Sequence, residues 1–202
     1  HLKTVGIERV VVVTGHLGDA IVAELPAAHP DVDLVFVHNE HYRTTNNIYS
    51  LWLARAEFDE DFLLLEADIV CRAEVLAPLT AAAEGTSVAL VSPRTWFMDG
   101  ACVELEGSPP RITAPRQIPA GEHRPHHHKT VNFYRIASAF ARGWLTARLE
   151  EKVAAADLSA YYETLFAEAI DRGVETFLAA VVPDGDWFEI DNLDDHDIAE
   201  YR

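Results

Sequence analysis

Residues 9–14 are Arg-Val-Val-Val-Val-Thr, a continuous β-branched run that predicts a strand buried on both faces. Residues 17–25 follow with apolar side chains at the spacing of one helix face, and Pro26 closes that segment. A second strand is predicted over residues 33–37. Strand, helix and strand in this order form the unit of a parallel sheet covered by helices. The sequence therefore predicts an α/β fold.

The rest of the chain continues this pattern with a shift toward antiparallel pairing. Helices are predicted over residues 48–56, 75–83, 137–149, 160–172 and 194–201, and strands over residues 62–65, 88–91, 131–136, 176–182 and 187–190. A hairpin is predicted from residues 101–105 and 111–113, and residues 115–128 read as a loop. The central sheet is therefore expected to be mixed and mostly parallel, in one domain over residues 1–202.

Composition excludes several classes of protein. The 16 Lys and Arg against 33 Asp and Glu give a formal charge of −17, which opposes binding to nucleic acid or to an anionic membrane surface. The two cysteines, Cys71 and Cys102, are too few for a disulfide scaffold and fit a reducing cytoplasm. No apolar run reaches the roughly 18 residues of a membrane span, and no signal peptide opens the chain. A cytoplasmic location is expected.

Two acidic pairs follow predicted strands. Glu66-Ala67-Asp68 comes after residues 62–65, and Glu189-Ile190-Asp191 ends another strand. Carboxylates at neighbouring strand ends suit Mg²⁺, which takes oxygen ligands together with phosphate oxygens. The alternative is that Asp191 is only an N-cap of the last helix.

Asn46 and Asn47 precede a predicted helix. An Asn side chain offers both a donor and an acceptor, and so suits the edge of a nucleotide base. The alternative is a helix cap followed by an amphipathic helix, although one Asn would suffice for capping.

Lys129 is a candidate ligand for an anion, because it lies beside the predicted loop in a strongly acidic chain. His126, His127 and His128 resemble a metal-binding tract, but consecutive residues of a strand point to opposite faces. Their role stays open.

Tyr162, Glu163 and Trp187 are candidates for caging a cationic head group, because aromatic rings and a carboxylate attract an amine. The alternative for these side chains is a place in the core.

Together, several segments resemble one family. They are Val12–His16, Asn39–Ala54 with its Thr-Asn-Asn-Ile-Tyr-Ser-Leu core, Leu63–Asp68, Lys129–Tyr134, Tyr161–Glu163 and Trp187–Glu200. The chain thereby resembles nucleotidyltransferases of the sugar-nucleotide pyrophosphorylase fold. Within that group it is most similar to the cytidylyltransferases that act on 2-aminoethylphosphonate and phosphocholine, and more to the phosphonate branch.

The resemblance implies a three-layer, GT-A-like and Rossmann-like fold, and a Mg²⁺-dependent reaction of CTP with a small phosphonate or phosphate monoester. It implies that Asp68 and Asp191 hold Mg²⁺, and that Lys129 and Asn132 approach the second substrate. Lys129 would act in catalysis with the two aspartates. The residues implied at the nucleotide are Asn46, Asn47, Ser50, Glu66 and Asp68.

One feature of the family has no match in this sequence. The family opens with a strand, a Gly-rich loop containing an Arg, and a Pro-Lys pair that cradle the triphosphate. The chain begins instead at His1-Leu2-Lys3. We therefore expect it to be a piece of a longer polypeptide that contains this cradle, with a phosphonate-metabolising enzyme as a fused or associated partner.

Three alternative functions remain at this point. A GT-A-type glycosyltransferase would use Glu66-Ala67-Asp68 to hold a metal and a nucleoside diphosphate, and would release that diphosphate. A sugar-phosphate nucleotidyltransferase would release pyrophosphate with a different acceptor. A domain that binds a nucleotide or a partner without catalysis is the third.

Overall fold

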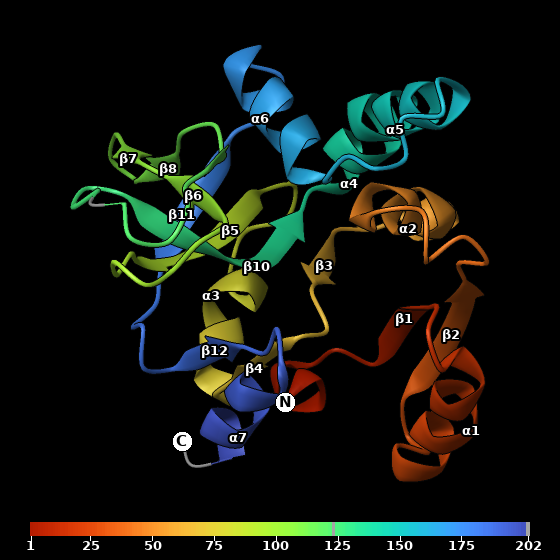
Figure 1. The fold of residues 1–202 in the computed structure, drawn as a ribbon. Helices are drawn as coiled ribbons and strands as arrows, with labels where there is room; N and C mark the ends of the chain where they lie inside the picture. The colour runs from red at the N-terminus through yellow and green to blue at the C-terminus, as the bar shows by residue number, and fades with distance from the viewer. Residues whose placement is uncertain (123, 201–202) are drawn as a thin grey trace. The chain divides into compact units, whose positions relative to one another are not determined.

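The computed structural model describes residues 1–122 and 124–200 (Figure 1). The chain forms two compact units. Unit 1 comprises His1–Glu60 and Ser138–Leu165, and unit 2 comprises Asp61–Ala137 and Phe166–Arg202. A single nucleotidyltransferase domain over residues 1–202 stays a prediction.

Unit 1 opens with the predicted strand, helix and strand. After the 3-10 turn η1 (Leu2–Val5), β1 (Arg9–Thr14) pairs in parallel with β2 (Asp33–His38), in register from Arg9↔Asp33 to Thr14↔His38. Helix α1 (Gly18–Ala28) connects them, and Pro26 lies inside it rather than at its end. The β1 valines are half-buried rather than fully buried, since a two-stranded sheet gives each strand one neighbour.

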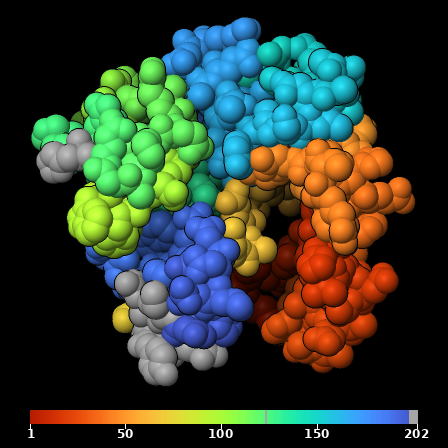
Figure 2. Space-filling view, in the orientation of Figure 1, coloured from red at the N-terminus to blue at the C-terminus, as the bar shows by residue number. Residues whose placement is uncertain are grey.

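The remaining helices of unit 1 pack beside each other. Helix α2 (Asn47–Leu53) continues into the 3-10 turn η2 (Ala54–Glu57) and contacts α5 (Thr146–Ala154). Figure 2 shows this contact between the orange and the cyan parts of the chain. Helix α5 is preceded by α4 (Ser138–Phe140) and the π-helical η4 (Ala141–Leu145), so the predicted helix over 137–149 is longer than expected.

Unit 2 is built on an eight-stranded sheet in the order β7-β8-β11-β5-β10-β6-β9, with β3 also paired to β10. The strands are β3 (Phe62–Leu65), β5 (Ser87–Pro93), β6 (Ala101–Val103), β7 (Leu105–Glu106), β8 (Arg111–Ile112), β9 (Arg116–Gln117), β10 (His128–Ile136) and β11 (Phe177–Val181). The α/β class and the mixed sheet are confirmed. Among the described strands of this sheet, however, β5 and β11 form the one parallel pair, so the expectation of mostly parallel pairing is wrong for unit 2.

Aromatic packing stabilises the centre of this sheet. The ring of Tyr134 on β10 lies edge-on to Phe166 at 5.2 Å and to Phe177 at 6.2 Å. All three side chains are fully buried. Helix α6 (Glu163–Asp171) supplies Phe166, and β11 supplies Phe177. Edge-to-face pairs of this kind contribute about 1 kcal/mol beyond the burial of their area.

Several local expectations are corrected. The predicted helix over 75–83 is the 3-10 turn η3 (Ala73–Leu76) followed by the short α3 (Ala77–Thr80), because Pro78 begins a new turn. A short strand, β4 (Ile69–Cys71), was not expected and pairs with β12 (Trp187–Glu189). The predicted loop over 115–128 contains β9. The terminal helix α7 spans Leu193–Glu200, and residue 201 lies outside the described residues.

None of the described helices is long and apolar enough to cross a membrane.

Candidate active site

The two acidic pairs are held together by a short antiparallel ribbon in unit 2. In this ribbon, Ile69 of β4 lies opposite Glu189 of β12. The backbone N–H of Ile190 also donates to the carbonyl of Asp68 at 2.8 Å. Ala67 and Asp68 form a turn between β3 and β4, and Glu189 is the last residue of β12, so the pairing of β4 with β12 brings the two acidic pairs together. The sequence signal for this meeting is the position of both Glu-x-Asp pairs, 66–68 and 189–191, at strand ends.

Three of these carboxylates converge. One oxygen each from Glu66, Asp68 and Glu189 lies within 4.8 Å of the other two. Carboxylate oxygens at such separations are the donor set that a hard divalent cation prefers, and Mg²⁺ commonly uses one or two of them beside water and phosphate oxygens. Glu189 belongs to this cluster although it was not among the predicted ligands. The residues present therefore fit the implied metal ion.

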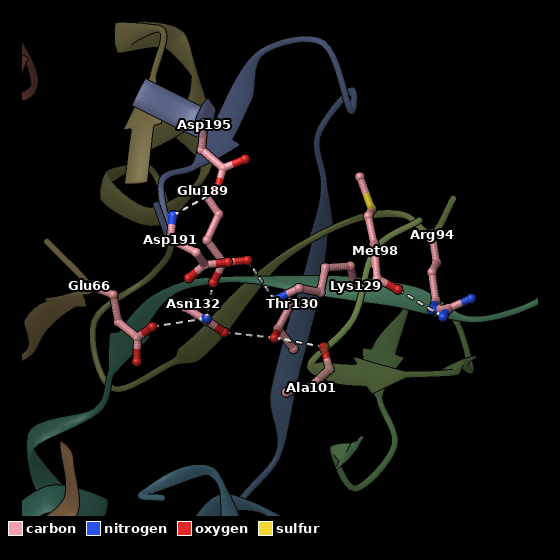
Figure 3. A network of polar contacts seen from close by, with 10 residues as sticks. All are labelled: Glu66, Arg94, Met98, Ala101, Lys129, Thr130, Asn132, Glu189, Asp191 and Asp195. Atoms are coloured by element: carbon pink, nitrogen blue, oxygen red, sulfur yellow. Dashed lines mark hydrogen bonds and ion pairs between the residues drawn. The ribbon is translucent and has the colours of Figure 1, made fainter. Parts of the chain in front are cut away.

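Asp191 lies beside this cluster and is coupled to it. Burial raises the pKa of the Asp191 carboxyl, and the negative charges of Asp68, Asp195 and Asp99 raise it further, whereas Lys129 opposes them. Its charge is therefore felt by the predicted partner Asp68. Figure 3 shows Asp191 next to Glu189.

The alternative role for Asp191, capping the last helix, is filled by other side chains. The Asn192 carboxamide oxygen accepts from the N–H groups of Asp194 and Asp195 at 2.9 and 3.1 Å. The Asp195 carboxylate in turn accepts from the N–H groups of Asp191 and Asn192 at 3.1 and 3.2 Å. This reciprocal cap fixes the backbone at Asp191 without using its carboxylate.

Lys129 supplies a cation to the cluster. Its side chain on β10 is 3% exposed, and its Nζ lies 3.3 Å from Oε2 of Glu189, which is 23% exposed. Burial raises the pKa of Glu189; the adjacent Lys129 ammonium opposes this shift, and the charges of Asp191 and Asp68 add to it. The ammonium of Lys129 is thus paired with a carboxylate of the acidic cluster, and its role toward an anionic substrate stays a prediction.

Asn132 links the cluster to β10 through a bulge. The pairing of β10 with β5 shifts register between Thr130 and Tyr134, and Asn132 has a φ of 57°. Its Nδ2 donates to Glu66 at 3.0 Å and to Glu189 at 3.5 Å, and its Oδ1 lies 2.8 Å from the Thr130 hydroxyl (Figure 3). The bulge therefore turns the Asn132 amide toward the carboxylates, as bulges next to active sites commonly do.

In unit 1, the predicted nucleotide residues form a second polar group around the start of α2. Asn46 is the N-cap, and its Oδ1 accepts from the N–H of Asn47 at 2.7 Å. Oδ1 of Asn47 accepts from the N–H of Tyr162 at 2.9 Å. Buried Asn39 donates to the Ser50 hydroxyl at 3.2 Å. The cap role of Asn46 is confirmed, and contact of Asn46, Asn47 and Ser50 with a base stays a prediction.

The candidates for a head-group cage are mostly covered. Tyr162 is 2% exposed, Glu163 6% and Trp187 5%. Nδ2 of Asn47 donates to Glu163 at 3.4 Å. An aromatic cage needs open ring faces. This burial fits the core alternative, and a head-group role for the three residues stays a prediction.

The histidine tract lies beside two other acidic residues, Glu104 and Glu106. His126 and His128 line a cavity of about 500 Å³ with Glu104 and Glu106, and Nδ1 of His127 lies 3.9 Å from Glu104. Burial lowers the pKa of His128. Among the described residues, no metal-ligand group includes these histidines.

The comparisons with known proteins bear on the resemblance and on the fold. No protein-family model matches the chain. An alignment of 205 positions that covers the whole chain gives 32% identity to the CMP-5'-(3-aminopropyl)phosphonate synthase of Streptomyces rubellomurinus. The chain spans 32% of the length of that relative.

The solved structures show the fold. The CTP:phosphocholine cytidylyltransferase of Streptococcus pneumoniae has a TM-score of 0.72 at 16% identity, covering 99% of this chain and 80% of its own. The inositol-1-phosphate CTP transferase of T. maritima has a TM-score of 0.73 at 18% identity, covering 96% and 74%. This chain has the nucleotidyltransferase fold. A UDP-glucose pyrophosphorylase shares it at a TM-score of 0.75 and 12% identity, covering 99% and 84%.

The resemblance that the sequence predicted is thus confirmed. By sequence the chain is similar to a CMP-5'-(3-aminopropyl)phosphonate synthase, and by fold it is similar to a phosphocholine cytidylyltransferase and an inositol-1-phosphate CTP transferase.

Proposed function

We propose that this nucleotidyltransferase transfers CMP from CTP to a small phosphonate or phosphate monoester and releases pyrophosphate. The observation that carries the proposal is the convergence of Glu66, Asp68 and Glu189 beside the buried ammonium of Lys129. The carboxylates could hold a divalent cation that binds the triphosphate of CTP, and the Lys129 ammonium could bind the acceptor. Such a site suits a reaction between two polyanions. The name of the Streptomyces relative supports a phosphonate as the acceptor.

The chemistry needs charge neutralisation rather than a general base. The attacking phosphonate or phosphate oxygen is already anionic, and it displaces pyrophosphate from the α-phosphorus of CTP. Two like unit charges about 4 Å apart repel by ~4 kcal/mol at an effective dielectric of 20. Bound Mg²⁺ would offset this repulsion and polarise the triphosphate. Asp68 and Asp191 would hold it, with Glu66 and Glu189 available as further ligands.

Lys129 and Asn132 would act on the second substrate. The Lys129 ammonium would pass from Glu189 to the acceptor oxyanion, because a dianionic phosphonate attracts it more strongly than one shared carboxylate. Asn132 would orient Glu66 and Glu189, and donate to the acceptor. Positioning of this kind is the usual source of catalysis in phosphoryl transfer.

In unit 1, Asn46, Asn47 and Ser50 would lie at the cytosine of CTP. The Asn39–Ser50 hydrogen bond orients that hydroxyl, which supports the proposal. We retain Tyr162, Glu163 and Trp187 as weaker candidates for the head group, since their burial leaves them little open surface.

We propose a cytoplasmic location for the protein, in keeping with the two free thiols, Cys71 and Cys102. Since the chain spans a third of its Streptomyces relative, a fused phosphonate-metabolising partner also remains part of the proposal.

The test is release of pyrophosphate by the full-length protein with CTP, Mg²⁺ and one acceptor at a time. The acceptors are 2-aminoethylphosphonate, 2-hydroxyethylphosphonate, phosphocholine and glucose 1-phosphate. We expect turnover with a phosphonate or phosphocholine, and as the second product an anhydride that joins CMP to the acceptor through a P–O–P bond. Turnover with glucose 1-phosphate alone would indicate a sugar-phosphate nucleotidyltransferase. Release of a nucleoside diphosphate from a sugar donor would indicate a glycosyltransferase, and no turnover at all would favour a domain that only binds.

A further inference from the structure

The segment Arg94–Gly100 of unit 2 is clamped by its own first residue. The Arg94 guanidinium donates to the carbonyls of Met98 at 2.8 Å, Pro119 at 2.9 Å and Glu122 at 2.6 Å. Figure 3 shows the bond to Met98. On the far side of Asp99, the carbonyl of Gly100 accepts from the N–H of Ile118 at 3.0 Å. Hydrogen bonds thus fix the backbone immediately before and after Asp99.

This segment rests on the ammonium of Lys129. A Cβ added to Gly100 would lie 3.1 Å from Nζ of Lys129 and 3.3 Å from its Cε. Gly100 also has a φ of 95°, which side-chain-bearing residues rarely adopt. Glycine is therefore needed for the backbone to approach Lys129 this closely. Asp99 directly precedes Gly100, and consecutive Cα atoms are about 3.8 Å apart. The backbone of Asp99 is therefore one residue away from the glycine that lies against Lys129, the proposed ligand of the acceptor oxyanion.

Asp99 is exposed, and so are its neighbours Trp96 at 70% and Phe97 at 57%. Burial raises the pKa of the Cys102 thiol and the Asp99 charge adds to this shift; Cys102 itself lies opposite Lys129 in the pairing of β6 with β10. One segment therefore carries an exposed carboxylate and two exposed aromatic rings, and its Gly100 lies against Lys129, whereas Tyr162 and Trp187 are buried. A carboxylate with open rings is the chemistry that receives an organic cation.

We propose that Asp99 is the specificity-determining residue that binds the ammonium head of an aminoalkylphosphonate acceptor, with Trp96 and Phe97 beside it. The inference rests on the proposed function and specifies that the acceptor carries a positively charged head group. The phosphonate end binds Lys129, and the alkyl chain, which is only a few bonds long, extends along Gly100 to Asp99. A neutral hydroxyalkyl head gains little from this carboxylate, so Asp99 selects the cationic acceptor.

The experiment compares two acceptors that differ only in the charge of the head group. Wild type, Asp99→Asn and Asp184→Asn full-length proteins are assayed with 2-aminoethylphosphonate and with 2-hydroxyethylphosphonate at saturating CTP and Mg²⁺. Asp184 is an exposed acid of the same unit, and its substitution removes the same net charge. For Asp99→Asn we expect KM for the amino acceptor to rise at least tenfold. KM for the hydroxy acceptor and for CTP should stay within twofold, and Asp184→Asn should match wild type.

Equal changes for both acceptors, no change for either, or a wild-type preference for the neutral head would overturn the role of Asp99 while leaving cytidylyl transfer intact. Absence of pyrophosphate release by wild type with every acceptor would refute the proposed function itself, and this inference with it.

Discussion

The ammonium of Lys129 lies 3.3 Å from the carboxylate of Glu189, and these two side chains are 3% and 23% exposed. They come from β10 and β12, which are far apart in the sequence. Removing one partner of a largely buried ion pair destabilises the fold, because the other charge then stays buried without its counter-ion. The pair therefore makes the acidic cluster dependent on one lysine.

Lys129→Met should lower the free energy of unfolding of the metal-free protein by about 2 kcal/mol at pH 7.5. The loss should shrink at pH 5, because the pKa of Glu189 is raised in the folded state. The folded carboxyl then binds a proton at a pH where the unfolded one, with a pKa of about 4.3, does not, so folding gains stability as the pH falls. Urea unfolding at both pH values, with a chelator present, measures this.

The control for this charge pair is Lys152→Met, whose partner Asp157 is 44% exposed, and it should cost less than about 1 kcal/mol. The double variant Lys129→Met with Glu189→Gln should recover part of the loss, since it removes the stranded charge. A single variant as stable as wild type at pH 7.5 would contradict the prediction.

Asp68→Ala and Asp191→Ala should each abolish turnover and leave the fold intact. Removing a carboxylate from the cluster relieves repulsion in the metal-free state while weakening the hold on Mg²⁺. Pyrophosphate release measures the first effect, and the rise in melting temperature on adding Mg²⁺ measures the second. Asp184→Ala, at an exposed position, is the matched control. A variant with more than about a tenth of wild-type activity would remove that aspartate from the metal site.

Asn132 should tolerate glycine better than alanine. Its φ of 57° is strained for a side chain with a Cβ, by about 1 kcal/mol, and glycine avoids that cost. Asn132→Gly should therefore be more stable to urea than Asn132→Ala by about this amount. Both should lose activity alike, because both remove the amide that binds Glu66. Equal stability of the two variants would mean that the bulge relaxes.

His128 should make a contribution that lowers the free energy of unfolding as the pH falls below about 6.5, the ordinary pKa of histidine, because burial lowers the pKa of His128. Below this pH, His128 is protonated in the unfolded chain but not in the folded state, so the falling pH favours unfolding. His128→Gln should make the pH dependence shallower between 6.5 and the lowered folded-state pKa. His29→Gln, at an exposed position, should leave the slope unchanged. Identical slopes for wild type and His128→Gln would refute the prediction.

The sequence by itself determined the α/β class, the β1-α1-β2 unit, the cap at Asn46 and the place of the two acidic pairs. These features depend on periodicity and on local hydrogen bonding, which neighbouring residues carry. The same local rules misplaced the end of α1, since Pro26 removes one hydrogen bond near a helix end without ending the helix.

Only the tertiary structure decided how the site is assembled. Asn132 reaches Glu66 across 66 residues and Glu189 across 57, and Gly100 lies on Lys129. Contacts between distant strands determine which segments pair, where β10 bulges and which side chains are buried. The spacing of residues within one segment does not predict these contacts. For that reason the convergence of Glu189 with Glu66 and Asp68, and the contact of Gly100 with Lys129, emerged from the fold, whereas the acidic pairs and Lys129 were visible in the sequence.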